Sequence, residues 1–436
     1  MTLVVREHRR VVGIVLVVVV GSLAGGLAQQ QQKASTDFLV INVRVFDGIR
    51  TLQNTHVAVT ERIIRAVGGD LTPWRRLPVI DGAGLTLVPG LIDSHTHVRD
   101  AEELRQAMRL GVTTMLDMGA TEVLPSQQLF ALREAAQVTA NMSDLRAAGY
   151  IAAPPAAGLP TPTLPPFEEA NRFVASRRSD GSDYLKIALT GVRSANSGAA
   201  NLDERTVKAL VSAAHANGML AIAHIETLDD VRVALSADID GLAHVWRQGG
   251  ANPEVARRVA EQRVFVSATL AIPDGRFPEV RASLLADPRF SPFLSNQAKE
   301  HLARSFAPRT TGGSLTELRA SLDAHLTAVR SLHEAGARLL IGTDSSRSNP
   351  AVHGVSAHRE LELLTQAGLT PLEILTAATA NAAESFRLND RGRILPGFRA
   401  DMLLVRGDPT SDVLAIRDIA RVWKAGVEVD RTVIDR

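Results

Sequence analysis

The segment Leu85-Thr-Leu-Val-Pro-Gly-Leu-Ile-Asp-Ser-His-Thr-His97 is an apolar stretch that ends in two histidines. Side chains of a β-strand alternate between its two faces, so His95 and His97, at positions i and i+2, point the same way. Two imidazoles that meet at the end of a strand can hold one divalent metal ion. The pattern therefore predicts a metal site that activates water.

Other short apolar segments also end in a potential ligand, namely His224, His244 and Asp344. Lys186 lies inside a further apolar segment, residues 183–189, where a free ammonium group would be costly. Only five of the 48 Lys and Arg residues are lysines, so a lysine in a buried strand is an exception to the composition. The six candidate metal ligands are His95, His97, Lys186, His224, His244 and Asp344.

The composition is that of an ordinary globular protein, with 436 residues of which 45% are hydrophobic and 22% charged. A net charge of +1 gives no electrostatic case for a nucleic-acid partner. The absence of cysteine excludes disulfides and zinc–thiolate sites. We expect a small-molecule substrate as the partner, and the sequence leaves a homo-oligomer open.

The beginning of the chain has the layout of a secretory signal peptide. Arginines precede the apolar run 11–20, and the small residues Gly26 and Ala28 follow it. This order predicts that residues 1–28 are a signal peptide cleaved near Ala28, and that the protein is exported to the periplasm or secreted. A retained membrane anchor is the alternative, but an apolar run of about ten residues is shorter than the ~20 that span a bilayer. We therefore expect no stable membrane span after cleavage.

Residues 38–88 and 396–436 consist of short strand-like segments separated by turns, without a long helical period. We expect these two ends of the chain to pair into one small β domain.

Residues 89–395 alternate short apolar segments with stretches in which apolar residues recur at helical spacing. Eight parallel strands with intervening helices predict a (β/α)8 barrel, an α/β fold whose active site lies at the C-terminal ends of the strands. All candidate ligands except Lys186 lie at such ends. The expected strands are residues 86–93, 111–117, 148–152, 184–189, 219–224, 240–245, 264–269 and 338–343.

Two connections are long enough to form lids or substrate walls, residues 153–167 and 271–318. The second follows the seventh expected strand, and a guanidinium group on it could hold a carboxylate end of the substrate. Its candidate arginines are Arg276, Arg281, Arg289, Arg304 and Arg309. His353 and His358, which follow Asp344, are further candidates for contact with the substrate.

Five motifs distributed over the chain resemble those of the amidohydrolase superfamily, specifically the branch of imidazolonepropionase-like enzymes and Xaa-Pro or Xaa-Arg dipeptidases. They are Leu87-Val-Pro-Gly-Leu-Ile-Asp-Ser-His-Thr-His97, Gly111-Val-Thr-Thr114, Ile341-Gly-Thr-Asp344, Ala378-Thr-Ala-Asn381 and Gly392-Arg-Ile-Leu-Pro-Gly-Phe-Arg-Ala-Asp401. The resemblance implies a deformed barrel, residues 89–395, and a small β-sandwich built from residues 38–88 and 396–436.

The resemblance also implies roles for the six candidate ligands. His95, His97 and Asp344 would hold one divalent metal ion, and His224 and His244 a second. Lys186 would bridge the two ions as a carbamate formed with CO2, which arginine cannot form because it stays protonated. Asp344 would be both ligand and proton shuttle for a metal-activated hydroxide. Zn suits ligands of this kind, with Mn or Fe as alternatives.

These features favour a hydrolase that cleaves an amide C–N bond of a small substrate, such as an N-acyl amino acid or a dipeptide. A lactone, ester or cyclic-amide hydrolase with the same binuclear centre is a second interpretation, because such a centre polarises any carbonyl group. A non-catalytic extracytoplasmic binding protein is a third, which the complete ligand set disfavours.

Overall fold

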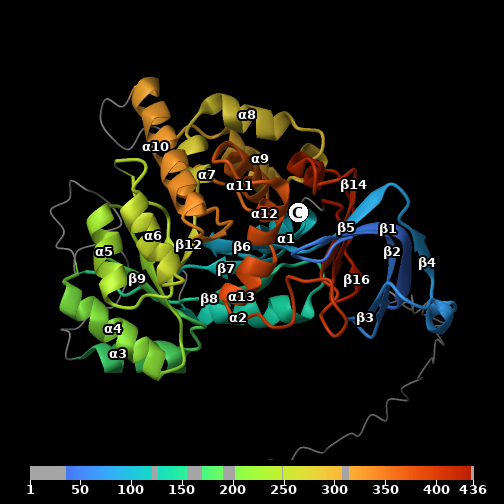
Figure 1. Cartoon of the computed structure of the whole chain (residues 1–436), viewed down its shortest axis with the longest axis horizontal. Helices are drawn as coiled ribbons and strands as arrows, with labels where there is room; N and C mark the ends of the chain where they lie inside the picture. Colours follow the sequence, from blue (N-terminus) through green and yellow to red (C-terminus); the bar gives the residue numbers. More distant parts are fainter. Residues whose placement is uncertain are drawn as a thin grey trace, which may run out of the picture. The chain divides into compact units, whose positions relative to one another are not determined.

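The segment that leads to His95 is divided between two sheets in the computed structural model of the chain (Figure 1). Strand β5 (Leu85–Pro89) pairs with strands from both ends of the chain, whereas β6 (Leu91–Thr96) begins the barrel-like part. Gly90 lies between them and packs so closely on Thr113 that a Cβ atom there would come within 2.2 Å of its Oγ1 atom. The predicted single strand 86–93 is therefore wrong, because the chain changes sheets at Gly90.

The structure describes residues 36–119, 126–154, 169–189, 202–247, 249–306 and 314–433. The predicted signal peptide, residues 1–28, and most of the connection 153–167 lie outside these ranges. Within them, no helix combines the length and the apolar character that a membrane crossing requires.

Strands from both ends of the chain share one eight-stranded sheet, as expected from the strand-rich ends. Its order is β16-β15-β14-β5-β1-β2-β3, with β4 paired to β1. Residues Ser35–Arg436 nevertheless form one compact unit, so the boundaries of a separate β domain stay a prediction. Besides β5, the strands are β1 (Phe38–Phe46), β2 (Thr51–Thr60), β3 (Ile63–Val67), β4 (Val79–Asp81), β14 (Met402–Arg406), β15 (Ile419–Lys424) and β16 (Val427–Glu428).

The barrel-like part consists of two arcs of parallel strands, β6-β7-β8 and β9-β10-β11-β12-β13. Single parallel bridges, Ala152↔Ile187 and Thr96↔Ser345, join the arcs, and the described strands do not form one continuous closed ladder. After β6, the strands are β7 (Val112–Asp117), β8 (Asp144–Ala147), β9 (Leu185–Ala188), β10 (Ala221–His224), β11 (Gly241–Ala243), β12 (Phe265–Ser267) and β13 (Arg338–Leu340).

The third barrel strand is β8 and not the predicted segment 148–152. Two polar side chains, Asp144 and Arg146, conceal it in the sequence. Asp144 can be buried because Arg391, Arg399 and Lys424 contact its carboxylate. Of the predicted segment, Ala152 makes a single bridge, since Gly149, at φ +71°, interrupts the extended backbone.

Helices cover the outside of the barrel strands, and the largest buried cluster lies between the two layers (Figure 1). Polar side chains cap the N-termini of several of these helices. Asp100 caps α1, Asp203 caps α4 and Thr227 forms a capping box on α5. The long connection 271–318 contains helices rather than irregular loop. The α-helices are α1 (Ala101–Arg109), α2 (Ser126–Val138), α3 (Ala170–Asp180), α4 (Glu204–Ala216), α5 (Leu228–Ser236), α6 (Pro253–Glu261), α7 (Ala271–Asp274), α8 (Pro278–Ala286), α9 (Asn296–Ala303), α10 (Leu315–Glu334), α11 (Val355–Gln366), α12 (Pro371–Ala377) and α13 (Ala380–Ser385), and short 3-10 helices occupy Thr72–Trp74, Ser291–Phe293 and Val413–Arg417.

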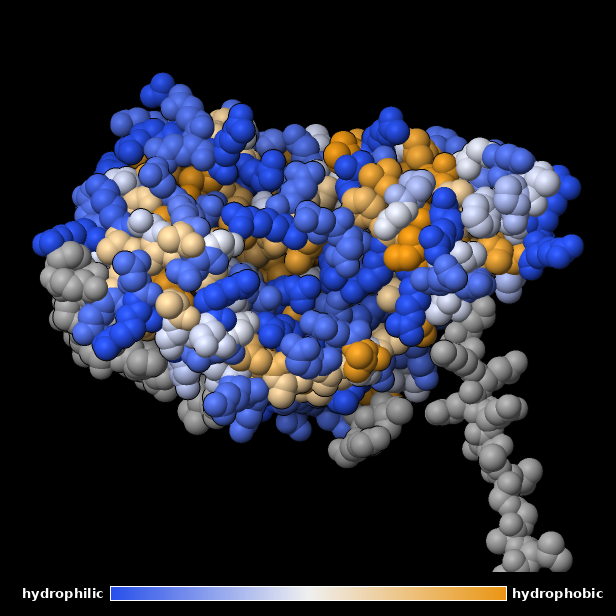
Figure 2. All heavy atoms as spheres, turned by 90° about the horizontal axis from the view of Figure 1, so that it is seen from below, coloured by the Kyte–Doolittle hydropathy of each residue, from blue (hydrophilic) through white to orange (hydrophobic). Residues whose placement is uncertain are grey.

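On the face drawn in Figure 2, hydrophilic residues predominate and hydrophobic ones occur in scattered patches. Scattered apolar side chains are normal on a protein surface and do not mark a docking site.

Candidate functional site

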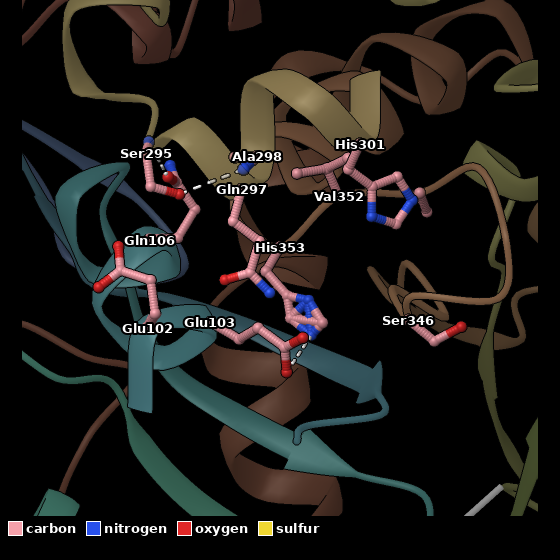
Figure 3. Close-up of a pocket in the computed structure, with 11 residues that line it drawn as sticks. Glu102, Glu103, Gln106, Ser295, Gln297, Ala298, His301, Ser346, Val352 and His353 are labelled. Atoms are coloured by element: carbon pink, nitrogen blue, oxygen red, sulfur yellow. Dashed lines mark hydrogen bonds and ion pairs between the residues drawn. The ribbon is translucent and has the colours of Figure 1, made fainter. Parts of the chain in front are cut away.

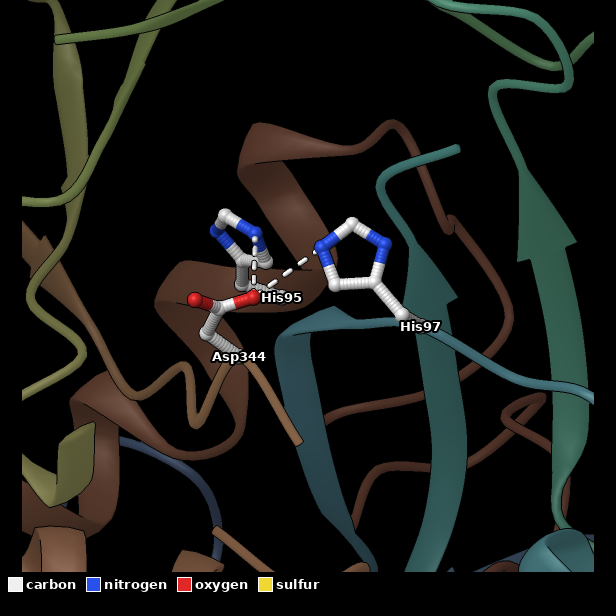
Figure 4. A group of neighbouring side chains, drawn as sticks. All are labelled: His95, His97 and Asp344. Atoms are coloured by element: carbon white, nitrogen blue, oxygen red, sulfur yellow. Dashed lines mark ion pairs between the residues drawn. The ribbon is translucent and has the colours of Figure 1, made fainter. Parts of the chain in front are cut away.

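His95, His97 and Asp344 converge where β6 ends and the chain leaves β13 (Figure 4). One potential ligand atom of each lies within 4.8 Å of the others. The same Asp344 oxygen, Oδ1, is 3.0 Å from His97 Nε2 and 3.5 Å from His95 Nε2. These three residues, which sequence analysis predicted as ligands of one metal ion, therefore lie together.

His244 and His224 continue this cluster from the ends of β11 and β10. The ring centroids of His244 and His95 are 4.7 Å apart, and those of His244 and His224 are 4.6 Å apart. His244 thus lies between the group of three and His224. The arrangement brings together side chains that are up to 249 residues apart in the sequence, from His95 to Asp344.

Lys186 lies in β9 and is only 2% exposed. Burial lowers its pKa from 10.5 to about 7, although the charges of Asp344 and Asp117 act in the opposite direction. Burial is also the main cause that lowers the pKa of His95, and the charge of Lys186 is the next. The lysine therefore lies within electrostatic reach of the histidines, and the structure gathers all six sequence-predicted residues in one region.

Hydrogen bonds to the far ring nitrogens orient two of the imidazoles. His97 Nδ1 is 2.7 Å from the carbonyl oxygen of Gly119, which assigns the proton to Nδ1 and leaves Nε2 free to face Asp344. His244 Nδ1 is 2.8 Å from Thr269 Oγ1. Outer contacts of this kind are typical of histidines that hold a metal ion.

Three residues of this region that are not glycines have a positive φ, in the left-handed region. The φ values are +76° at His244, +55° at Thr269 and +51° at Asp344. Such conformations cost roughly 1–3 kcal/mol each and persist where the surroundings enforce them, commonly at functional sites. The sequence gives no sign of these turns, because none of the three residues is a glycine.

Buried carboxylates that sequence analysis missed support these turns. Asp93 accepts hydrogen bonds from the backbone N–H and the hydroxyl of Thr343, at 3.0 and 2.7 Å, and so fixes the residue before Asp344. Glu360, on α11, accepts from the N–H groups of Leu270 and Ala271, at 2.9 and 2.7 Å. Glu360 therefore holds the chain directly after Thr269, the partner of His244. An acidic residue inside an apolar segment, as in the case of Asp93, was the signal available in the sequence.

The donor set fits divalent metal ions. Imidazole nitrogens and a carboxylate are ligands that Zn, Mn and Fe accept. His224 Nε2 is buried, and its one recorded partner, Glu226 Oε1 at 3.5 Å, is too distant for a good hydrogen bond. An unpaired buried polar atom is costly, and coordination to a metal ion would satisfy it.

Three of the five arginines predicted to recognise a carboxylate, Arg281, Arg289 and Arg304, have recorded contacts within the protein. Arg281, 4% exposed, donates to the Gly275 carbonyl oxygen at 2.5 Å, and Arg289 pairs with Asp287. Arg304 donates to the Arg347 carbonyl oxygen at 2.8 Å, and Arg309 lies outside the described residues. Burial leaves Arg281 little room for a ligand, and recognition of a carboxylate by the other arginines stays a prediction.

Arg247 lies at the edge of the candidate site. Its Nη2 atom is 2.9 Å from Glu226 Oε1, and the same oxygen is 3.5 Å from His224 Nε2. The Arg247 side chain is 43% exposed. A half-exposed guanidinium group one contact away from His224 is suited to an anionic group of a ligand.

The two histidines after Asp344 differ in their surroundings. His358 is fully buried in α11, and its Nε2 atom is 2.8 Å from the Leu110 carbonyl oxygen, so packing accounts for it and the predicted substrate contact is wrong. His353 lines a small cavity beside the site.

Comparison with known proteins identifies the chain's relatives. The profile of the amidohydrolase family matches residues 86–435. The ochratoxinase of Aspergillus niger is 25% identical over 268 residues, which are 59% of this chain and 48% of the relative. The imidazolonepropionase of Deinococcus deserti is 38% identical over 104 residues, 23% of this chain and 26% of the relative. The chain therefore aligns with about half or less of the length of these relatives.

Solved structures show the same fold. A Xaa-Pro dipeptidase with bound methionine in its active site gives a TM-score of 0.70 at 19% identity and covers 90% of this chain and 100% of its own. The A. niger ochratoxinase gives a TM-score of 0.68 at 19% identity and covers 90% of this chain and 95% of its own. Phenylurea hydrolase B gives a TM-score of 0.70 at 21% identity and covers 91% of this chain and 97% of its own. These likenesses support a TIM-barrel-like α/β fold. With a family profile that spans residues 86–435, and as the sequence motifs indicated, the chain belongs to the amidohydrolase family.

Proposed function

We propose that this protein is a metal-dependent hydrolase that cleaves an amide C–N bond of a small substrate, such as an N-acyl amino acid or a dipeptide. The observation that carries the proposal is the convergence of His95, His97 and Asp344 with His224 and His244, within electrostatic range of Lys186. Membership of the amidohydrolase family and the likeness to an ochratoxinase and a Xaa-Pro dipeptidase support it.

In this proposal the six residues hold two divalent ions, with Zn expected and Mn or Fe as alternatives. His95, His97 and Asp344 would hold one ion, and His224 and His244 the other. Lys186 would supply a carbamate ligand shared by the two ions, and the lowering of its pKa to about 7 favours the neutral amine that reacts with CO2. Bound divalent ions would lower the pKa of a coordinated water and polarise the scissile carbonyl group.

Asp344 is the residue that we expect to move the proton. Figure 4 shows that one of its carboxylate oxygens is directed at both His95 and His97. The other oxygen is then available to accept a proton from the attacking water and to return it to the leaving nitrogen. The backbone N–H of Asp344 itself donates to the His95 carbonyl oxygen at 2.7 Å, which helps to hold the residue in place.

A hydrolysis screen tests the proposed function. Purified protein loaded with Zn or Mn is assayed against N-acyl amino acids, dipeptides, lactones and esters, with chelator-treated protein as control. We expect metal-dependent turnover of amides. Faster turnover of lactones or esters would favour the alternative hydrolase, and turnover of none of them would favour a binding protein.

N-acyl amino acids and dipeptides share a carboxylate, and we expect Arg247 to bind it. Arg247→Ala should raise KM for a carboxylate substrate by about tenfold, because one charge-assisted hydrogen bond contributes ~1.5–3 kcal/mol, and should leave KM for the matching carboxamide unchanged. Steady-state kinetics on both substrates measures the difference. Arg232→Ala, which removes an exposed arginine paired with Asp229, is the control. Equal effects on both substrates would contradict this role.

We also propose that the protein is exported, periplasmic or secreted, on the layout of residues 1–28. Sequencing of the N-terminus of the protein from its host should find a start near residue 29. A chain that still begins at Met1, or that stays firmly in the membrane, would contradict export with cleavage.

A further inference from the structure

A small cavity lies between α1, α9 and the loop that follows β13 (Figure 3). Its volume is about 30 Å³, more than the ~10–15 Å³ that a single water molecule requires. The described side chains that line it include two carboxylates, Glu102 and Glu103, and two histidines, but no lysine or arginine. The cavity therefore offers hydrogen-bond acceptors to a small group.

His353 has an unsatisfied atom in this cavity. The residue is 5% exposed, and its Nε2 atom is buried without a hydrogen-bond partner. Glu103 Oε2 is 3.8 Å away, too far for a direct hydrogen bond. Figure 3 shows the two side chains directed at each other. Because burial lowers the pKa of His353, the ring is neutral near pH 7, and one of its nitrogens can accept a hydrogen bond.

Glu103 is held in one orientation. Its Oε2 atom accepts from the Arg99 N–H at 2.6 Å, and its Oε1 atom from Arg347 Nε at 2.9 Å. Arg347 also pairs with Asp100, and the charges of Glu103 and Asp100 act on Arg99 as well, so two cations balance these two carboxylates. Since each carboxylate oxygen can accept more than one hydrogen bond, Glu103 Oε2 keeps capacity for another donor.

The cavity adjoins the candidate metal site. Ser346, in its wall, is two residues after Asp344. His301, also in the wall, contacts the carbonyl oxygen of Asn349, and the Asn349 side chain donates to the carbonyl oxygen of Asp344. The cavity wall and Asp344 thus share one loop, and His353 lies within electrostatic range of His97.

We propose that this cavity binds the free α-ammonium group of a dipeptide substrate, which donates hydrogen bonds to Glu103 Oε2 and His353 Nε2. In a dipeptide the ammonium group is attached to the carbon that carries the scissile carbonyl, so it must bind next to the site where that carbonyl reacts. An ammonium group is close to water in size and has only donors to offer. The assignment rests on the proposed function and narrows its substrates from N-acyl amino acids to dipeptides.

The test uses two ligands that differ only in the amino group, L-leucyl-L-alanine and 4-methylpentanoyl-L-alanine. Calorimetry on metal-free protein measures binding of both, and steady-state kinetics on metal-loaded protein measures KM and kcat. We expect the dipeptide to bind at least about tenfold more tightly, the usual minimum for a hydrogen bond to a charged group. Glu103→Gln and His353→Phe should each reduce this preference for the dipeptide about tenfold and leave the affinity for the des-amino ligand unchanged. Glu204→Gln, which breaks an exposed ion pair with Lys208 on α4, is the matched control.

Equal binding of the two ligands to the wild-type protein, or no measurable dipeptide binding, would overturn the assignment and leave a buried water as the occupant. The same holds if both cavity variants fold normally and keep the full preference. If the dipeptide binds preferentially but is not hydrolysed, the proposed function fails while the assignment of the cavity stands.

Discussion

Replacement of Asp344 by asparagine is expected to lower kcat by about 10²–10⁴, the usual range for the loss of general acid–base catalysis. Asparagine keeps an oxygen that can face His95 and His97, so the geometry of the group of three survives. It cannot accept the proton that the attacking water must lose. Turnover should therefore fall much more than metal content, which kinetics and elemental analysis of the same preparation measure.

The control for this variant is Asp229→Asn, an exposed aspartate paired with Arg232 on α5, which should change neither quantity. A kcat within tenfold of the wild-type value would show that Asp344 does not shuttle the proton. A parallel loss of metal and activity would show that it acts as a ligand alone.

Replacement of Asp144 by asparagine is expected to lower the free energy of unfolding by about 3–5 kcal/mol, the cost of breaking a buried ion pair. Arg391, Arg399 and Lys424 each place a nitrogen 2.6 Å from its carboxylate. Burial opposes the charge of Asp144, but these three cations outweigh burial and hold the pKa of the carboxyl group well below its ordinary value. Without that carboxylate, buried cations lose their shared counter-charge. Urea unfolding at pH 7 measures the loss.

The pH dependence of this effect follows from the direction of the pKa shift. A group whose pKa is lower in the folded state stabilises the fold above its unfolded pKa of ~3.9 and loses that contribution as pH falls toward the folded value. The difference between wild type and Asp144→Asn should therefore shrink below pH ~4. Asp229→Asn should cost no more than ~1 kcal/mol, as exposed ion pairs do. A similarly small effect of Asp144→Asn would contradict the role of the cluster.

The candidate site could be predicted to the extent that its residues occupy strand ends. His224 and Asp344 follow short apolar segments, and parallel strands bring their C-terminal ends together, so local pattern and topology sufficed to predict their convergence. The depth of burial of Lys186 followed from the apolar residues around it.

What could not be predicted depends on contacts between distant segments. Strand β8 carries a charged residue, Asp144, which is tolerable only because residues some 250 positions later neutralise it. Glu360 supports the turn after Thr269, and neither segment reveals the other. The burial of Arg281, which is bonded within its own connection, is a further contact that the sequence does not reveal.

Metal content of the Lys186→Ala variant decides whether this lysine bridges a binuclear centre. Elemental analysis of protein loaded with Zn should find two ions per chain in the wild type. In Lys186→Ala, metal content and turnover should fall together, and short carboxylic acids should partly restore turnover by filling the space of the carbamate. A variant that keeps two ions and near-normal turnover would contradict the bridge and leave a single-metal site of His95, His97 and Asp344.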